Sequence, residues 1–207
     1  MERSLATMRA SRGAAKIGEE LRIELLRKGI HLLIAFVPGI ARVDLRLALG
    51  LLGLGTLAYA ACESLRMSGV VVPLVSRVTA LAARRRDAGK FVLGPVTLGL
   101  GAMLALLLYP DPAASMAIYA LAFGDGLSSL VGKTFGQIRL PFTKGKSLEG
   151  SLTCLTAVFV SSFALTRRLG PSLALAAFAT VVEAAPLKDF DNIVLPVLCG
   201  AAAVLLF

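Results

Sequence analysis

The sequence has few of the side chains that build zinc sites and disulfide frameworks. Its 207 residues contain one histidine, His31, and three cysteines, Cys62, Cys154 and Cys199. The cysteines stand singly inside apolar runs, so we interpret them as small hydrophobic residues of packed helices. A zinc site needs several His or Cys ligands, and no Ser-His-Asp arrangement is recognisable around the single histidine. We therefore expect neither a zinc site nor a Ser-His-Asp catalytic site.

The sequence also lacks a complete P-loop, although it twice contains the end of one. Residues 132–134 read GKT and residues 145–147 read GKS. A complete P-loop has another glycine five residues before the Gly-Lys pair, but Leu127 and Leu140 occupy those positions. The ordinary P-loop is excluded, and the two lysines need another explanation.

Long apolar runs dominate the rest of the chain. Hydrophobic residues make up 57% of the sequence, and the mean hydropathy is +0.79. This composition is typical of an integral membrane protein. The net charge of +9 reflects an excess of Lys and Arg residues. We interpret these residues as setting the orientation of the protein in the membrane and contacting anionic headgroups. No nucleic-acid partner is expected.

The apolar runs predict an all-α, polytopic membrane helix bundle of about seven transmembrane helices. A basic cytoplasmic leader (1–20) precedes a single integral-membrane catalytic domain (21–207), and no cleavable signal peptide is evident. The predicted spans are 26–42, 44–62, 91–109, 112–131, 148–166, 171–187 and 192–207.

Basic residues are distributed unevenly between the two ends of this bundle. Only Arg42, Arg46, Arg167 and Arg168 fall on one side of the predicted membrane, and the remaining Lys and Arg residues fall on the other. Because cytoplasmic loops carry the excess of basic residues, we expect the N-terminus in the cytoplasm and the C-terminus on the opposite side.

The segment between the second and third spans is too polar to cross the membrane. Apolar residues recur at helical spacing over 71–82, and Arg77 and the triplet 84–86 lie off this stripe. The pattern predicts a basic amphipathic helix on the membrane surface, with a solvated connector as the alternative.

Ionisable residues gather at the predicted cytoplasmic ends of the spans, where each is a candidate site residue. Asp125 lies inside a span without a partner nearby in the sequence, which favours a functional role. Glu24 and Lys28 stand at i, i+4, a spacing also typical of a simple helix-supporting pair, and His31 is equally compatible with an interfacial histidine. Ser128 belongs to a ridge of small residues, for which we predict helix packing.

Together these ends carry carboxylates, lysines and glycines. Carboxylate oxygens are ligands that Mg²⁺ prefers, whereas cations and backbone amides bind phosphates. The sequence therefore predicts a site for Mg²⁺ and a polyphosphate at the cytoplasmic edge of the membrane.

Four segments resemble one family of membrane enzymes. They are ELLRKGIH (24–31), FGDGLSSLVGKTFG (123–136), KGKSLEGS (144–151) and EAAPLKDFDNIVLPV (183–197). In this order they resemble the CTP-dependent lipid-alcohol kinases, which include dolichol kinase, phytol kinase and yeast-type diacylglycerol kinase. The resemblance spans residues 20 to 200, and it identifies residues 145–147 (GKS) as the lead-in to a K-S-x-E-G motif.

The resemblance implies Mg²⁺-dependent transfer of the γ-phosphoryl group of CTP to the hydroxyl of a polyprenol, phytol or diacylglycerol. It also implies roles for individual residues. The expected catalytic residues are Asp125, Lys146, Glu149, Glu183 and Asp191, of which Asp125 and Asp191 bind the metal and Glu149 or Glu183 orients the hydroxyl. The expected nucleotide-binding residues are Gly124, Gly132, Lys133, Lys146, Ser147, Gly150 and Asn192. The expected pocket-lining residues are Glu24, Lys28, His31, Glu63 and Arg66.

Two other functions stay open at this point. Phosphatidate cytidylyltransferase has a similar central block, but residues 141–150 (PFTKGKSLEG) lack its Ser-Pro, and residues 188–192 (KDFDN) lack its His and Asp-Arg. A small membrane transporter is the second alternative, although no convincing inverted repeat is visible.

Overall fold

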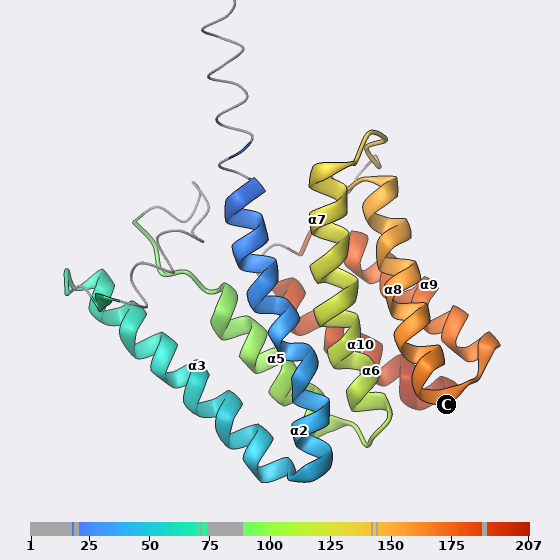
Figure 1. Cartoon of the computed structure of the whole chain (residues 1–207), viewed down its shortest axis with the longest axis horizontal. Coiled ribbons are helices and arrows are strands. Elements are labelled where there is room, and N and C mark those ends of the chain that lie inside the picture. Colours follow the sequence, from blue (N-terminus) through green and yellow to red (C-terminus); the bar gives the residue numbers. More distant parts are fainter. Residues whose placement is uncertain are drawn as a thin grey trace, which may run out of the picture.

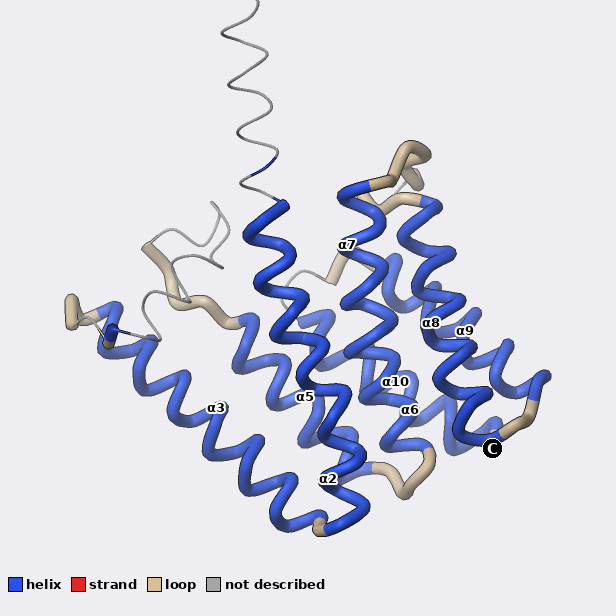
Figure 2. Tube along the Cα trace, viewed as in Figure 1, coloured by secondary structure: helices blue, strands red, loops and turns tan. Residues whose placement is uncertain are grey.

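The protein is described by a computed structural model, and the described residues form an all-α bundle, as predicted (Figures 1 and 2). The predicted leader and most of the predicted surface helix fall outside them, so both stay predictions. The structure describes residues 18, 21–70, 72–73, 89–141, 143, 145–187 and 190–207.

Each predicted span corresponds to a helical segment in the described ranges. A helix over 21–33 continues through η1 (Ile34–Phe36) into α2 (Val37–Val43). Residues 113–134 form one continuous helical path through the bundle. It consists of α6 (Ala113–Tyr119), η3 (Ala120–Asp125) and α7 (Gly126–Thr134). The other helices are α3 (Leu45–Met67), α5 (Gly94–Leu108), α8 (Leu148–Thr166), α9 (Leu169–Ala184) and α10 (Asp191–Leu206).

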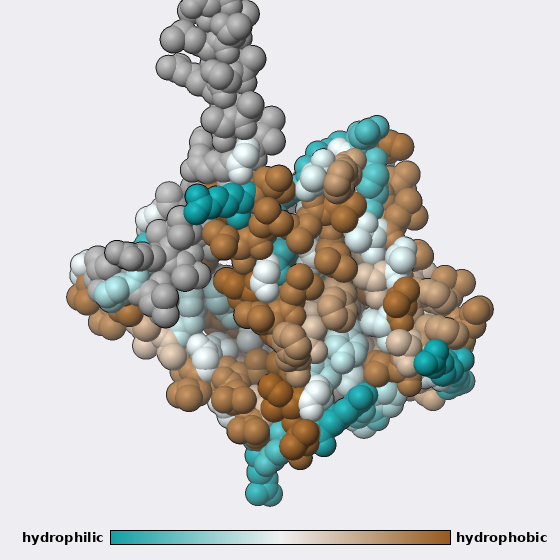
Figure 3. Space-filling view, in the orientation of Figure 1, coloured by the Kyte–Doolittle hydropathy of each residue, from teal (hydrophilic) through white to brown (hydrophobic). Residues whose placement is uncertain are grey.

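Within the described ranges, three helical paths are long and apolar enough to cross a membrane: Leu45–Met67, Ala113–Thr134 and Leu148–Thr166. Three shorter apolar helices, α5, α9 and α10, accompany them. Large hydrophobic side chains such as Leu54, Leu107 and Val181 are exposed, and brown apolar surface covers much of the face drawn in Figure 3. Such a surface suits lipid rather than water, and the chain is an integral membrane protein.

The path from α6 through η3 to α7 is the centre of the bundle. Within its most apolar window 67% of the residues are buried, compared with 6% for α3 and 28% for α8. On one side α6 and η3 pack with α5 and the first helix, where Leu98 and Ile118 are buried. On the other side they pack with α8, α9 and α10, around Met116, Val158 and Leu175. A charged residue on this path is therefore placed among other helices rather than against lipid.

The central path contains a π-helical stretch, η3, whose last residue is Asp125. π-Helical turns inside α-helices are rare and occur frequently at functional sites. Here the stretch ends at the one carboxylate that the central path carries.

Successive helices run in alternating directions, so their polar ends meet at one end of the bundle (Figure 1). The helix over 21–33, α5, α8 and α10 begin at this end, and α3, α7 and α9 finish there. The chain ends at Phe207, at the opposite end of the bundle. The relative arrangement of the candidate residues thus follows the prediction, while the membrane side that they face stays a prediction.

Candidate functional site

A pocket of about 400 Å³ lies at the polar end of the bundle, between the first helix, α7, α8, α9 and the start of α10. It combines four carboxylates, four cations and several small residues. Its predicted lining residues are Glu24, Lys28, Asp125, Gly132, Lys133, Lys146, Ser147, Gly150, Glu183 and Asp191. Sequence reasoning assigned no role there to Arg139, Thr143, Ser151 or Pro186, which also line it.

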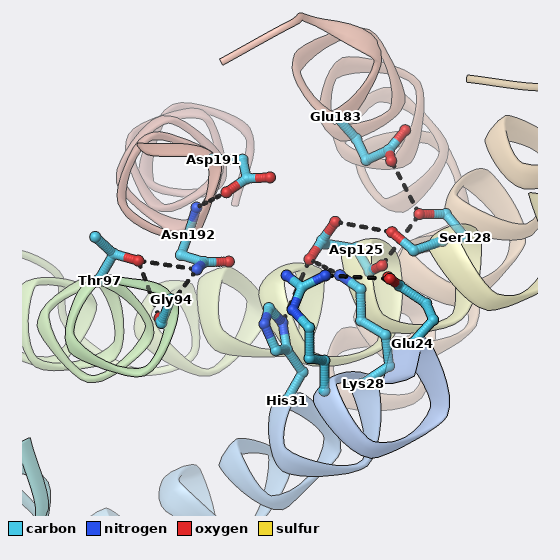
Figure 4. Close-up of polar contacts among 12 residues, drawn as sticks. Glu24, Lys28, His31, Gly94, Thr97, Asp125, Ser128, Glu183, Asp191 and Asn192 are labelled. Carbon is cyan, nitrogen blue, oxygen red and sulfur yellow. Dashed lines mark hydrogen bonds and ion pairs between the residues drawn. The ribbon is translucent and has the colours of Figure 1, made fainter. Parts of the chain in front are cut away.

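Asp125 is held at the base of the pocket by two residues of the first helix (Figure 4). Its Oδ2 atom accepts a hydrogen bond from Lys28 Nζ, and His31 Nδ1 lies 3.3 Å from the same oxygen. Lys28 and His31 reach one partner because residues three apart share a helix face. All three residues are buried. The prediction that Lys28 lines the pocket therefore agrees with the structure. His31 contacts Asp125 but does not line the pocket.

Glu183 and Lys146 form a second ion pair across the pocket. Ser128 donates a hydrogen bond of 3.0 Å to Glu183 Oε1, and Glu183 Oε2 is buried without a hydrogen-bond partner among the described residues. Ser128 is therefore more than the helix-packing residue that its spacing predicted. Spacing along α7 could not reveal this contact, because Glu183 is 55 residues away in the sequence.

Glu24 and Lys133 form the third pair, which joins the first helix to the end of α7. Arg27 also contacts Glu24, at 3.1 Å. The Lys133 side chain is 47% exposed and that of Lys146 is 29% exposed, whereas that of Lys28 is only 3% exposed. Lys133 and Lys146 are consequently the lysines that a ligand in the pocket can reach.

Lys146 lies on the loop before α8, outside the spans. Burial alone would lower the pKa of this ammonium group, but the nearby carboxylates of Glu183 and Asp125 raise it above its ordinary value. Lys146 therefore remains protonated at neutral pH.

Asp191 and Asn192 are neighbours in the sequence but have different environments. Asp191 lines the pocket. Asn192 turns away from it and donates hydrogen bonds to Thr97 Oγ1 at 2.9 Å and to the carbonyl oxygen of Gly94 at 3.3 Å (Figure 4). Asn192 does not line the pocket and its amide joins α10 to α5, so its predicted nucleotide contact stays a prediction.

The loop between α7 and α8 carries two pocket cations and is fixed by Glu149 and Ser147. The Glu149 Oε1 atom accepts hydrogen bonds from the backbone amides of Gln137, at 2.9 Å, and Ile138, at 3.2 Å. Ser147 caps α8 by accepting a hydrogen bond from the amide of Gly150. Glu149 does not line the pocket, and its contacts hold the loop, so its predicted catalytic role stays a prediction.

The predicted small residues bring α7 and α8 into close contact. A Cβ atom added at Gly150 would lie 2.8 Å from the carbonyl oxygen of Ser128 and 3.2 Å from Gly132 Cα. Gly124 instead packs on Val158 and Cys154 and is not a lining residue. Gly132 and Gly150 thus let α7 and α8 pack closely beside the pocket, and the nucleotide contact predicted for Gly124 stays a prediction.

Glu63 and Arg66, predicted to line the pocket, lie outside its lining. They pair with each other at 2.7 Å. Glu63 also accepts from the amide of Val92, and Arg66 donates to the carbonyl oxygen of Lys90. Both residues therefore fasten the segment before α5 to the end of α3. Helical spacing showed that they belong together but not which loop they hold.

Within the described residues, no group of three or more His, Cys, Asp or Glu side chains could hold a metal ion alone. The carboxylates Asp125 and Asp191 nevertheless both line the pocket. This donor set fits Mg²⁺, which is usually bound by one or two carboxylates together with substrate phosphates and water.

Replacement of Lys28 by Met tests the buried pair. Removal of one partner leaves Asp125 buried without its main counter-charge, and we expect a loss of about 3–5 kcal/mol of stability. Arg42→Ala is the control, because the Arg42–Asp111 pair is half exposed and should contribute less than about 1 kcal/mol. The measurement is the thermal unfolding midpoint in detergent, and equal midpoints for the two variants would contradict a supporting role for Lys28.

Replacement of Glu149 by Ala tests the loop. Loss of the shared acceptor should speed hydrogen exchange in the peptide that contains Gln137 and Ile138, since both amides lose their partner. Glu149→Gln keeps an acceptor oxygen and should retain most of the protection. Mass spectrometry of the exchanged protein measures the effect, and unchanged exchange in the alanine variant would show that Glu149 does not hold this loop.

Comparison with known proteins adds a separate observation. A probable chloroplastic phytol kinase of Triticum aestivum is 32% identical over 126 residues, which cover 51% of this chain and 41% of that protein. A chloroplastic farnesol kinase of Arabidopsis thaliana is 36% identical over 84 residues (40% of this chain and 27% of that protein). A dolichol kinase of Mus musculus is 33% identical over 89 residues (37% and 16%).

The matched regions span less than half the length of each of these three proteins. No family model matches the chain, and no solved structure matches it significantly. The curated proteins that the chain resembles are phytol, farnesol and dolichol kinases, and the resemblance to lipid-alcohol kinases that its motifs predict is confirmed.

Proposed function

We propose that the protein is a membrane kinase that transfers the γ-phosphoryl group of CTP to the hydroxyl of a lipid alcohol. The observation that carries this proposal is the pocket itself, in which reachable lysines and a carboxylate with an unpaired oxygen meet at one end of an apolar bundle. The similarity to phytol, farnesol and dolichol kinases supports the acceptor class. CTP as the donor is taken from the family resemblance.

Phosphoryl transfer depends mainly on positioning and on neutralising charge. In the proposed reaction, Lys146 and Lys133 hold the phosphates, and the hydroxyl oxygen of the lipid attacks the γ-phosphorus. The bond from that phosphorus to the β–γ bridging oxygen breaks, leaving CDP and a lipid phosphate.

Glu183 is the proposed proton acceptor. It lines the pocket and has an oxygen, Oε2, without a hydrogen-bond partner among the described residues, while Ser128 orients the other oxygen. A general base must lie within hydrogen-bond reach of the proton that it removes. Of the two glutamates considered from the sequence, Glu183 lines the pocket and Glu149 does not, which supports Glu183 as the base.

Mg²⁺ is the proposed cofactor, and Asp191 and Asp125 are its proposed ligands. When bound, Mg²⁺ would neutralise charge on the transferred phosphate. Asp191 makes no ion pair among the described residues, whereas Asp125 already contacts Lys28 and His31. We therefore assign Asp191 the direct contact and Asp125 a contact that is direct or through water.

The proposed location follows from the substrates. CTP is a cytosolic nucleotide, and the hydroxyl group of a lipid alcohol lies at the level of the headgroups. We propose that the polar end of the bundle faces the cytoplasm, in agreement with the uneven distribution of basic residues.

Position-specific labelling of the nucleotide tests the reaction. Purified protein in lipid–detergent micelles receives Mg²⁺, farnesol, phytol, a polyprenol or diacylglycerol, and CTP labelled at the α or the γ position. We expect label in the lipid from γ-labelled CTP alone, because only the terminal phosphoryl group moves.

The same experiment includes phosphatidate and γ-labelled ATP. Transfer of the α label to phosphatidate would identify the alternative, a cytidylyltransferase. Transfer from ATP but not from CTP would contradict the proposed donor. The absence of labelled lipid from every donor would contradict the kinase and favour the remaining alternative, a transporter.

Glu183→Gln tests the proposed base. Because the amide cannot accept the hydroxyl proton, we expect kcat to fall by about 10²–10⁴-fold with a smaller change in KM for CTP. Glu149→Gln is the matched control, with the same change of charge on a residue that lies outside the pocket lining, and should retain most activity. Equal losses in the two variants would remove Glu183 as the base.

A further inference from the structure

The four cations that line the pocket are not equally available to an anionic ligand. Lys28, Lys133 and Lys146 each form an ion pair with a carboxylate that also lines the pocket. Arg139 differs from them. In the described part of the chain its side chain makes one hydrogen bond, of 2.8 Å, to the carbonyl oxygen of Gly145, and it pairs with no carboxylate.

Arg139 is also accessible and held in place. The residue is exposed and lines the pocket. Its backbone forms a bridge with Ser147, and the adjacent residue Ile138 donates its amide to Glu149. Its bond to Gly145 occupies Nη1 only. Because a guanidinium group has five N–H donors in a planar fork, donors remain for a ligand.

We propose that Arg139 is an anion-binding residue that receives the terminal phosphates of the nucleotide. A phosphate that approaches Lys133 or Lys146 must compete with Glu24 or Glu183 for the ammonium group, and each exchange leaves a carboxylate to be neutralised. A phosphate that approaches Arg139 displaces no carboxylate. Arginine is also suited to this contact, since its fork binds two phosphate oxygens at once. The identity of the anion as a nucleotide rests on the proposed function.

Binding of inorganic tripolyphosphate tests this assignment without requiring catalysis. Isothermal titration of the full chain in nanodiscs with Mg²⁺ compares wild type, Arg139→Gln, Arg139→Lys and Arg22→Gln. Arg22 is exposed on the first helix, at the same end of the bundle, and does not line the pocket. The control thus removes the same charge from the same side of the protein.

We expect Arg139→Gln to raise the Kd for tripolyphosphate about tenfold, an effect within the range for charge-assisted hydrogen bonds. Arg139→Lys should show an intermediate effect, because it keeps the charge but loses the fork. Arg22→Gln should bind as wild type does. Equal thermal midpoints show that the variants are folded.

Three results would overturn the inference. Arg139→Gln could bind as tightly as wild type, Arg22→Gln could weaken binding equally, or wild type could fail to bind tripolyphosphate. These outcomes are separate from those of the labelling experiment. Arg139-dependent binding without any kinase activity would keep this site and refute the proposed reaction. CTP kinase activity with an unchanged KM for CTP in Arg139→Gln would support the proposed reaction and refute this site.

Discussion

The buried contact between Lys28 and Asp125 constrains the rest of the structure. An ionised carboxylate on the most buried path of a membrane bundle is stable only with a counter-charge, and the counter-charge comes from a helix 97 residues earlier in the sequence. The pair therefore fixes the depth of the first helix against the central path. It also determines where Glu24, one turn before Lys28, can meet Lys133. This one contact thus fixes how the first helix and α7, which line two sides of the pocket, align with each other.

The same electrostatic constraint explains why the polar groups form a cluster. The pocket holds four carboxylates and four cations among its described lining residues, and three lysine–carboxylate pairs account for six of these eight groups. Near-neutrality lets the cluster lie at the edge of an apolar bundle without a large solvation penalty. Among the described residues, Arg139 and Asp191 remain outside these pairs, and under the proposed function they are the groups left to contact a metal–polyphosphate complex. A pocket of paired groups alone would be stable but poorly suited to bind such a complex.

The sequence predicts the helices and the membership of the cluster better than the individual contacts. Apolar runs locate the spans because lipid requires long apolar segments, and helical spacing places Lys28 and His31 on one face. Neither pattern reports which distant element a side chain meets. Glu63 and Arg66 share a face as expected but hold the segment before α5, and Asn192 joins α10 to α5. Ser128 looks like a packing residue until Glu183 is placed beside it. Arg139 has no helical neighbours to draw attention to it, because it lies on a loop.

The contacts of Lys146 and Glu183 suggest how nucleotide binding and proton removal are linked in the proposed reaction. As long as Lys146 pairs with Glu183, the ammonium group contacts one carboxylate oxygen, Oε1. In the proposed reaction, phosphates that draw Lys146 toward them separate this pair and leave Glu183 Oε1 with Ser128 alone. Ser128 keeps one carboxylate oxygen in place during the exchange, so the orientation of the other oxygen is retained. In the proposed reaction, Glu183 is thus released from Lys146 only when the donor occupies the pocket, which disfavours a productive encounter of the lipid hydroxyl with an empty site.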